Sequence, residues 1–128
     1  MTATPPDLLQ QQIDYYRARA GEYDEWFLRQ GRYDRGPAAN KAWFDEIATL
    51  RQAVAEFHPR GCVLELACGT GLWTEQLLPH ADKIIAVDAG AEAIELNRAR
   101  VASDRVRYEL ADLFSWAPQE LFDVVFFA

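Results

Sequence analysis

Cysteines, long apolar runs and an excess of basic residues are all scarce or missing in this sequence. Its two cysteines are Cys62 and Cys68, which on one extended segment would lie ~20 Å apart, too far for a disulfide. No apolar run approaches the ~20 residues that cross a bilayer, and the first residues lack the basic and apolar regions of a secretory signal. We therefore expect free thiols in a soluble, cytoplasmic protein with no membrane partner.

The charge balance is acidic. Against 20 Asp and Glu residues stand 13 Lys and Arg, which leaves a formal net charge of -7 and argues against a nucleic-acid partner. His, Cys and carboxylate residues show no metal-ligand spacing, so no metal site is expected. With 128 residues, of which 50% are hydrophobic, the chain is long enough for one domain with a core, and a small ligand suits it best.

The first 60 residues have helical patterns. A helix opens at Pro5 with apolar residues at helical spacing and is interrupted at Gly21, and residues 22–29 form a short second helix. After a loop at 31–37, a long helix runs from Pro37 to Phe57. Five apolar residues are predicted to share one face of it: Trp43, Ile47, Leu50, Val54 and Phe57.

The remaining residues alternate between strand and helix patterns. Short β-prone runs occupy residues 62–67, 83–88, 105–110 and 122–128, and helical segments are expected at 71–80 and 90–102. Apolar strands separated by helices are typical of a parallel sheet covered on both faces, so the fold class is α/β. We expect residues 1–60 to form a helical cap and residues 61–128 an α/β portion, together one domain.

Chemistry-bearing residues fall at the ends of these strands. Glu65 and a loop containing Gly69 and Gly71 finish the first strand, Asp88 ends the second, and Asp112 follows the third. The carboxyl ends of parallel strands are where open α/β sheets bind ligands. Each acidic residue taken singly reads as a helix cap or a solvated loop residue, but together they indicate a ligand site.

The loop distinguishes between nucleotide-like ligands. A dinucleotide fingerprint has a third glycine, and here Thr74 stands in that place. Glu65 would repel a pyrophosphate, whereas S-adenosylmethionine has no phosphate and carries an ammonium and a sulfonium cation. The residues favour the latter, and an NAD-type dinucleotide-binding domain is the alternative.

Four motifs resemble those of the class I S-adenosylmethionine-dependent methyltransferases. VLELACGTG at 63–71 is similar to their glycine motif, AVDAG at 86–90 to their second-strand motif, ADLFSW at 111–116 to their adenine-contacting motif and DVVFFA at 123–128 to their fourth-strand motif. The resemblance implies a Rossmann-like sheet with strand order 3-2-1-4, the first part of the family's seven strands. YYRARAGEYDEW at 15–26 is similar to the family's helical cap.

The resemblance also implies roles for individual residues. Glu65 would hold the methionine ammonium, Asp88 with Ala89 beside it would face the ribose, and Asp112 would bind the adenine amino group. The other residues that it assigns to the cofactor are Ala67, Cys68, Gly69, Thr70 and Gly71 around the methionine part, Leu113 against the adenine ring, and Phe127 and Ala128 along the sulfonium. Ala67 stands where the family most often has glycine, and we expect binding to survive this change.

The tyrosines, cysteines and histidines are the other side chains that could take part. Tyr16 is the best candidate among the N-terminal tyrosines to cover the cofactor, although aromatic residues at helical spacing also serve as plain core. Cys68 is expected to be a small packed residue rather than a nucleophile. His58 and His80 should lie at the amino end of the sheet, opposite the ligand, so we identify no catalytic base.

The resemblance predicts a methyltransferase for a small-molecule acceptor, with this chain supplying the cofactor half because the sequence stops at the fourth-strand motif. The alternatives are a cofactor-binding fragment without catalysis and the dinucleotide-binding domain. The fourth strand, 122–128, would form an apolar edge with only Asp123 as a charge. Because such edges recruit other strands, we expect the chain to self-associate there.

Overall fold

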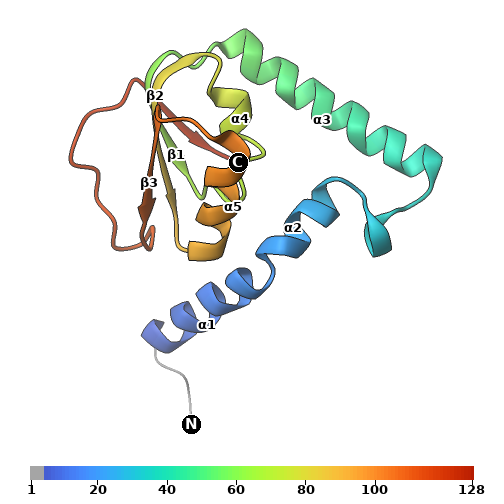
Figure 1. The fold of residues 1–128 in the computed structure, drawn as a ribbon, viewed down its shortest axis with the longest axis horizontal. Helices are drawn as coiled ribbons and strands as arrows, with labels where there is room; N and C mark the ends of the chain where they lie inside the picture. The colour runs from blue at the N-terminus through green and yellow to red at the C-terminus, as the bar shows by residue number, and fades with distance from the viewer. Residues whose placement is uncertain (1–4) are drawn as a thin grey trace.

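The computed structural model describes residues 5–128, with side chains from residue 7 onward apart from that of Tyr16. Three N-terminal helices precede the sheet: α1 (Pro5–Ala18), α2 (Ala20–Phe27) and α3 (Pro37–Phe57), with a 3-10 turn at Gly31–Tyr33. α1 and α2 run past α5, and α3 leads back to the sheet (Figure 1). They form an arm along the helical side of the sheet.

The sequence pattern predicts a break between the first two helices at Gly21, but in the structure the break between α1 and α2 falls at Arg19. Arg19 precedes α2 with φ -105° and ψ 4°, while Gly21 lies inside the first turn of the helix. Backbone N–H groups in a first turn have no partner within the helix, so glycine is tolerated there. The prediction of two helices is correct, and its boundary is wrong by two residues.

The prediction for α3 is confirmed at both ends. Pro37 occupies its first turn and His58, in the left-handed conformation with φ 57°, ends it before Pro59. The predicted apolar face is only partly covered: Ile47 is buried, whereas Leu50 and Phe57 are 51% and 68% exposed. Trp43 and Val54 are half-buried and pack against core clusters. Leu50 and Phe57 contact solvent because few described elements pack against α3.

The sheet confirms the predicted parallel α/β fold. Its strands are β1 (Gly61–Leu66), β2 (Ala81–Asp88), β3 (Val106–Leu110) and β4 (Val124–Phe127), and their order is β3-β2-β1-β4 with every pair parallel. β1 is central and pairs with β2 on one side and β4 on the other. All four carboxyl ends therefore lie along one edge.

The helices between the strands differ in length. α5 (Ala91–Val101) matches the helix expected at 90–102, but α4 (Thr74–Leu77) is much shorter than the expected 71–80. Residues 71–73 complete the turn that leaves β1, and Pro79 cannot continue a helix. The prediction of a helix here is correct, and its predicted length is wrong.

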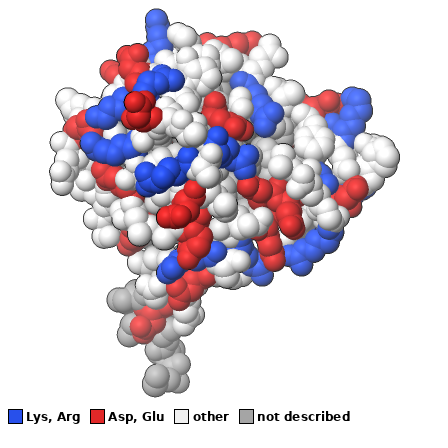
Figure 2. Space-filling model, in the orientation of Figure 1, with Lys and Arg blue, Asp and Glu red and all other residues white. Residues whose placement is uncertain are grey.

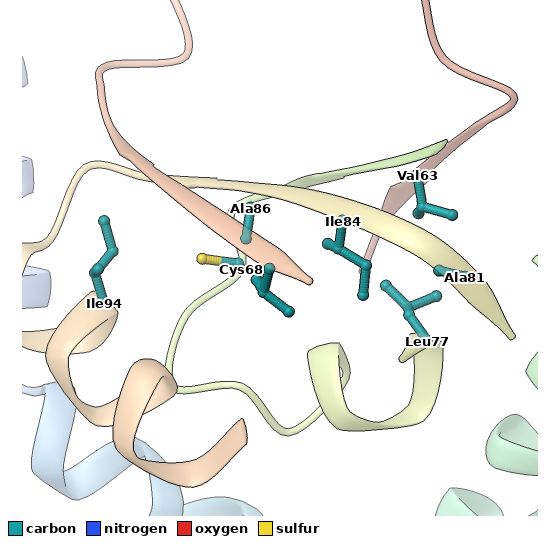
Figure 3. Packing of buried hydrophobic residues seen from close by; sticks show 8 residues of the cluster. Val63, Cys68, Leu77, Ala81, Ile84, Ala86 and Ile94 are labelled. Atoms are coloured by element: carbon teal, nitrogen blue, oxygen red, sulfur yellow. The ribbon is translucent and has the colours of Figure 1, made fainter. Parts of the chain in front are cut away.

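The two faces of the sheet are covered differently. On one face, side chains from the strands meet α4 and α5, and Figure 3 shows Ile84 and Ala86 directed toward Leu77 and Ile94. On the other face the buried residues Leu64, Ile85 and Val87 are covered by the connector between β3 and β4. This connector contributes Leu113, Trp116 and Phe122. Both faces over β1 and β2 are thus closed.

Ion pairs join the arm to the sheet portion. Arg17 in α1 donates from Nε and Nη2 to the two carboxylate oxygens of Glu92 in α5, both at 2.9 Å. Figure 2 shows acidic and basic side chains interleaved on the face it draws. Across residues 5–128, no helix is both long and apolar enough to cross a membrane.

Candidate functional site

The predicted site residues gather at the carboxyl edge of the sheet. Residues 67–71, here called the glycine loop, leave β1 directly after Leu66, and Asp88 ends β2. The backbone of Ala111 donates to the Asp88 carbonyl at 3.0 Å, which brings Asp112 to the same edge. Phe127 pairs in register with Leu66 and reaches this edge too. The strand ends thus place four motifs around one site.

Glu65 is the buried carboxyl group of the site. It is 2% exposed, and the hydroxyl of Thr74 donates to its Oε1 at 2.5 Å. The pKa of Glu65 is raised to about 8: burial and, to a smaller extent, the nearby Asp88 carboxylate raise it, and the Thr74 hydrogen bond lowers it. Among the described residues no Lys or Arg forms an ion pair with it. The protonated form prevails at pH 7 until a cation approaches.

The glycine loop has a left-handed backbone at three places. Ala67, Gly69 and Gly71 have φ values of 54°, 56° and 97°. The left-handed backbone at Ala67 explains why the family most often has glycine at this position, since an alanine in the left-handed region costs about 1 kcal/mol. A Cβ on Gly71 would lie 2.9 Å from Asn97 Cγ, whereas one on Gly69 would meet no atom within 4 Å. The loop therefore packs tightly against Asn97 at Gly71 and has free space beside it at Gly69.

Cys68 lies in the loop without chemical reactivity. It is 5% exposed, and burial raises the pKa of its thiol. Because the thiolate is the nucleophile, this thiol is inert. Cys68 and the half-buried Cys62 are both free, which confirms that they do not pair with each other.

Asp88 orders the backbone around it. Its Oδ1 accepts from the Gly69 N–H at 3.1 Å and its Oδ2 from the Gly90 N–H at 2.9 Å, with half-buried Ala89 between. Each carboxylate oxygen can accept a second hydrogen bond. Asp88 is therefore a cap for the turn before α5 and also retains acceptors for a ligand diol.

The remaining predicted residues lie at the border of the site. Asp112 accepts from the backbone N–H of Phe114 at 3.0 Å and closes a turn, while Leu113 packs against the buried cluster of Leu64, Ile85 and Val87. Phe127 and Ala128 are exposed. The backbone of Tyr16 lies in α1, and its side chain lies outside the described residues.

Thr70 is directed away from the open side of the loop. It is 2% exposed, and its hydroxyl donates to Asp24 Oδ1 in α2 at 2.5 Å. The family resemblance implies that the backbone of the loop, Thr70 included, lies around the methionine part of the cofactor. In the structure the Thr70 side chain contacts the N-terminal arm, and only its backbone can face a ligand.

Asn97 and Thr74 support the site and were missed by the sequence analysis. Asn97 Nδ2 donates to the carbonyl of Gly69 at 3.1 Å and to Thr74 Oγ1 at 3.0 Å, and the Tyr108 hydroxyl donates to Asn97 Oδ1 at 2.6 Å. Both Asn97 and Thr74 are fully buried. A polar residue three positions after Ile94, on the core face of a helix, was the available signal.

The amino end of the sheet holds the two histidines, as predicted. His58 Nδ1 and His80 Nδ1 lie 2.8 Å apart, at the starts of the segments that enter β1 and β2. Among the described residues no group of three or more His, Cys, Asp or Glu side chains is arranged to hold a metal ion.

Comparisons with solved structures agree with the fold. The complex of DhpI with SAH is 40% identical, with a TM-score of 0.72, over 97% of this chain and 54% of that chain. A complex of DhpI with SAM and HEP is 39% identical, with a TM-score of 0.70, over 98% of this chain and 52% of that chain. This chain thus spans about half the length of these relatives.

Comparisons with sequences point the same way. Nodulation protein S of Rhizobium tropici is 31% identical over 68 residues, which are 52% of this chain and 29% of that protein. A family model described as a methyltransferase domain matches residues 63–128, about half of the chain. The matched residues contain Glu65, the glycine loop and Asp88. This chain belongs to the methyltransferase domain family.

Proposed function

We propose that this chain binds S-adenosylmethionine at the carboxyl edge of β1 and β2, and that it is the cofactor-binding half of a methyltransferase for a small-molecule acceptor. The observation that carries the proposal is Glu65, a buried carboxyl group directly below the glycine loop and without an ion-pair partner among the described residues. The ionised form of such a group is costly in the interior unless a cation compensates it. The ammonium of the cofactor is that cation.

The other residues of the edge suit the remaining parts of the cofactor. The backbone of the glycine loop offers close approach to the methionine part at Gly69, where a side chain would meet open space. Asp88 has free acceptor positions for two ribose hydroxyls. Asp112 and Leu113 follow β3, where an adenine ring would extend. Phe127 and Ala128 border the loop from β4.

The chemistry requires little acid or base assistance from the chain. The bound cofactor supplies an activated methyl group on a positively charged sulfur. In-line displacement then depends on alignment and on exclusion of water. Glu65, the glycine loop and Asp88 would align the cofactor by holding it in place. The N-terminal arm would exclude water.

The relatives support this proposal by what they bind. DhpI is solved with SAH and with SAM and HEP, and both complexes share about 40% of their aligned residues with this chain. A NodS N-methyltransferase from Bradyrhizobium japonicum, solved with SAH, is 21% identical with a TM-score of 0.62 and shares the fold.

Calorimetric titration tests the proposal. The chain is expected to bind S-adenosylmethionine and S-adenosylhomocysteine more tightly than NAD, and Glu65→Gln is expected to weaken binding of both by at least tenfold through loss of a charge-assisted hydrogen bond. Glu22→Gln, at an exposed ion pair of α2, is the matched control and should bind like the parent. Tighter binding of NAD would overturn the assignment and favour a dinucleotide-binding domain.

A second candidate is a cofactor-holding unit that transfers no methyl group by itself. It is favoured by the share of the relatives that the chain covers, 54% and 52% for the two DhpI structures. A transfer assay with radiolabelled S-adenosylmethionine and small amine and alcohol acceptors separates the two. We expect binding without turnover by these 128 residues, and robust turnover would refute this candidate.

We also propose that residues 1–60 act as a cap over the cofactor. α1 and α2 lie against α5, whose N-terminus adjoins Asp88 and Gly90. If Tyr16 contributes to the cap, Tyr16→Ala should weaken the binding of S-adenosylhomocysteine. Unchanged affinity would leave Tyr16 as an ordinary helix residue.

The exposed edge of β4 supports self-association of the chain as isolated. β4 is an edge strand, and its residues Val125 and Phe127 are 61% and 68% exposed. Apolar edges recruit further strands. Light scattering at micromolar concentration should show dimers or larger species, and Val125→Lys should shift them toward monomer. A parent chain that is a stable monomer would contradict this proposal.

A further inference from the structure

The N-terminal arm touches the glycine loop through one closed set of contacts. Asp24 in α2 accepts the Thr70 hydroxyl hydrogen bond at 2.5 Å and forms an ion pair with Arg100 of α5. Arg100 in turn donates from Nε to the Thr70 carbonyl at 3.0 Å. We call these three residues, Asp24, Thr70 and Arg100, the junction. It joins the arm, the loop and α5 at one point.

The junction is more protected than the other ion pair between the arm and the sheet portion. The side chains of Asp24 and Arg100 are 24% and 25% exposed, against 43% and 49% for Arg17 and Glu92. Thr70 itself is 2% exposed. Exposed pairs contribute little because water screens them, whereas a partly buried pair with added hydrogen bonds interacts more strongly.

The junction holds a residue that lies between two glycines. Thr70 lies between Gly69 and Gly71, both with positive φ, and glycine loses more conformational freedom on ordering than any other residue. The junction holds both the hydroxyl and the carbonyl of the residue between them. Fixing Thr70 therefore fixes the backbone on which the cofactor would lie.

α5 holds the loop on its other side. Asn97 and Arg100 are three residues apart on one helix face, and they donate to the carbonyls of Gly69 and Thr70. Without Asp24, the loop would be held only from α5 and from Asp88 at the end of β2. Asp24 adds a contact from α2, and it also orients the Arg100 side chain by pairing with it.

We propose that Asp24 and Arg100 are positioning residues for the ligand: through Thr70 they hold the glycine loop in its binding conformation only when α2 is docked. The inference rests on the proposed function and deepens it. It makes the affinity for the cofactor depend on a residue of the arm that has no contact with the strand ends. The arm would then order the loop as well as cover it.

The affinity for S-adenosylhomocysteine, measured by calorimetry on the full chain, is the first test. Asp24→Ala and Thr70→Val should each weaken binding at least tenfold, and the double variant should be no weaker than the poorer single one, because both changes remove the same contact. Thr70→Ser, which restores the hydroxyl, should recover most of the affinity lost in Thr70→Val. Glu22→Gln, elsewhere on α2 with surface ion pairs only, is the matched control.

Hydrogen exchange of the free chain is the second test and needs no ligand. In Asp24→Ala, amides of residues 68–72 and of α2 should exchange faster together, while those of β1 keep their protection. Denaturant unfolding of each variant shows whether global stability has changed.

The outcomes separate the two proposals. A parent that binds S-adenosylhomocysteine together with a Thr70→Val variant that binds equally well would overturn the role of the junction alone. So would loop exchange that is the same in Asp24→Ala and the parent. A parent that does not bind S-adenosylhomocysteine would overturn the proposed function and this inference with it.

Discussion

The two ends of the sheet are made from similar residues that are used in opposite ways. At the amino end, Gly61 has φ 81°, and a Cβ there would overlap the Asp123 carboxylate. At the carboxyl end, Gly69 has φ 56°, and a Cβ there would meet no atom within 4 Å. Asp123 accepts from the Cys62 N–H at 2.8 Å, and Asp88 accepts from the Gly69 N–H at 3.1 Å.

The difference separates structural from functional use of the same residue types. At the amino end the glycine makes room for a carboxylate of the chain itself, and His58 and His80 contact each other. At the carboxyl end the glycine leaves room free, and a buried carboxyl group lies below it without a basic partner among the described residues. The amino end is closed by its own side chains, and the carboxyl end is the one that we propose binds the cofactor.

The largest expected effect is on the pH dependence of stability, through Glu65. The pKa of this carboxyl group is raised from 4.5 to about 8, so its contribution is full below pH 4.5 and is lost as the pH rises toward 8. The loss amounts to about 1.4 kcal/mol per pH unit within that window. Glu65→Gln cannot ionise and should remove this slope in urea unfolding measured between pH 5 and 9. If the unfolding free energy of the parent chain did not fall with pH in this window, the raised pKa of Glu65 would be contradicted.

Alanine at the two glycines sharpens the comparison next. Gly61→Ala combines a left-handed alanine with loss of the Asp123 hydrogen bond to Cys62, and should destabilise the fold by about 2 to 4 kcal/mol. Gly69→Ala has only the backbone cost of about 1 kcal/mol, but its methyl group would enter the space left for a ligand. Urea unfolding and titration with S-adenosylhomocysteine measure the two effects. Equal destabilisation would remove the distinction between the ends.

The two aspartates provide a matched pair. If Asp88 binds the ribose as proposed, Asp88→Ala should lower the affinity for S-adenosylhomocysteine at least tenfold through loss of two charge-assisted hydrogen bonds, and Asp88→Asn should lower it less. Asp123→Ala loses a comparable backbone contact at the other end and should leave the affinity unchanged, with about 1 kcal/mol lost in stability. If Asp88→Ala binds as well as the parent, Asp88 is a cap only.

The smallest effect concerns two alanines with left-handed backbone. Ala67 in the loop has φ 54° and Ala102 at the end of α5 has φ 46°. Replacement of either by glycine relieves strain but gives the unfolded chain more freedom, so each should change stability by less than about 1 kcal/mol. Only Ala67→Gly should alter ligand affinity. An equal response of affinity at Ala102 would show that the effect is not local to the site.

Much of this arrangement could be predicted because it follows from local patterns. The strands are apolar runs between turns, so their positions and the parallel class are readable, and the order β3-β2-β1-β4 came from a family resemblance that the structure confirms. Glu65 and Asp88 were found because a strand end fixes where a side chain lies. The length of α4 was misjudged, since a turn after Gly71 uses residues with good helical propensity.

The contacts that could not be predicted join segments far apart in the sequence. Asp24 and Arg100 are separated by 76 positions, and neither lies in the four strand-end motifs. Their contact depends on how α2 crosses α5, which no periodicity encodes. Asn97 is the intermediate case: its place on the core face of α5 was readable, but its partners in the glycine loop were not.

The central position of β1 has a consequence for how the chain folds. β1 pairs with β4 across 61 residues, as seen in the contact of Cys62 with Asp123. Closing so long a loop before any pairing compensates for it slows folding, and parallel sheets with distant partners are among the slower topologies. During synthesis, the β1 edge that pairs with β4 has no partner strand until β4 has been made. Until then, the apolar edge of β1 is open to any other strand, which makes the newly made chain most vulnerable to aggregation at its own centre.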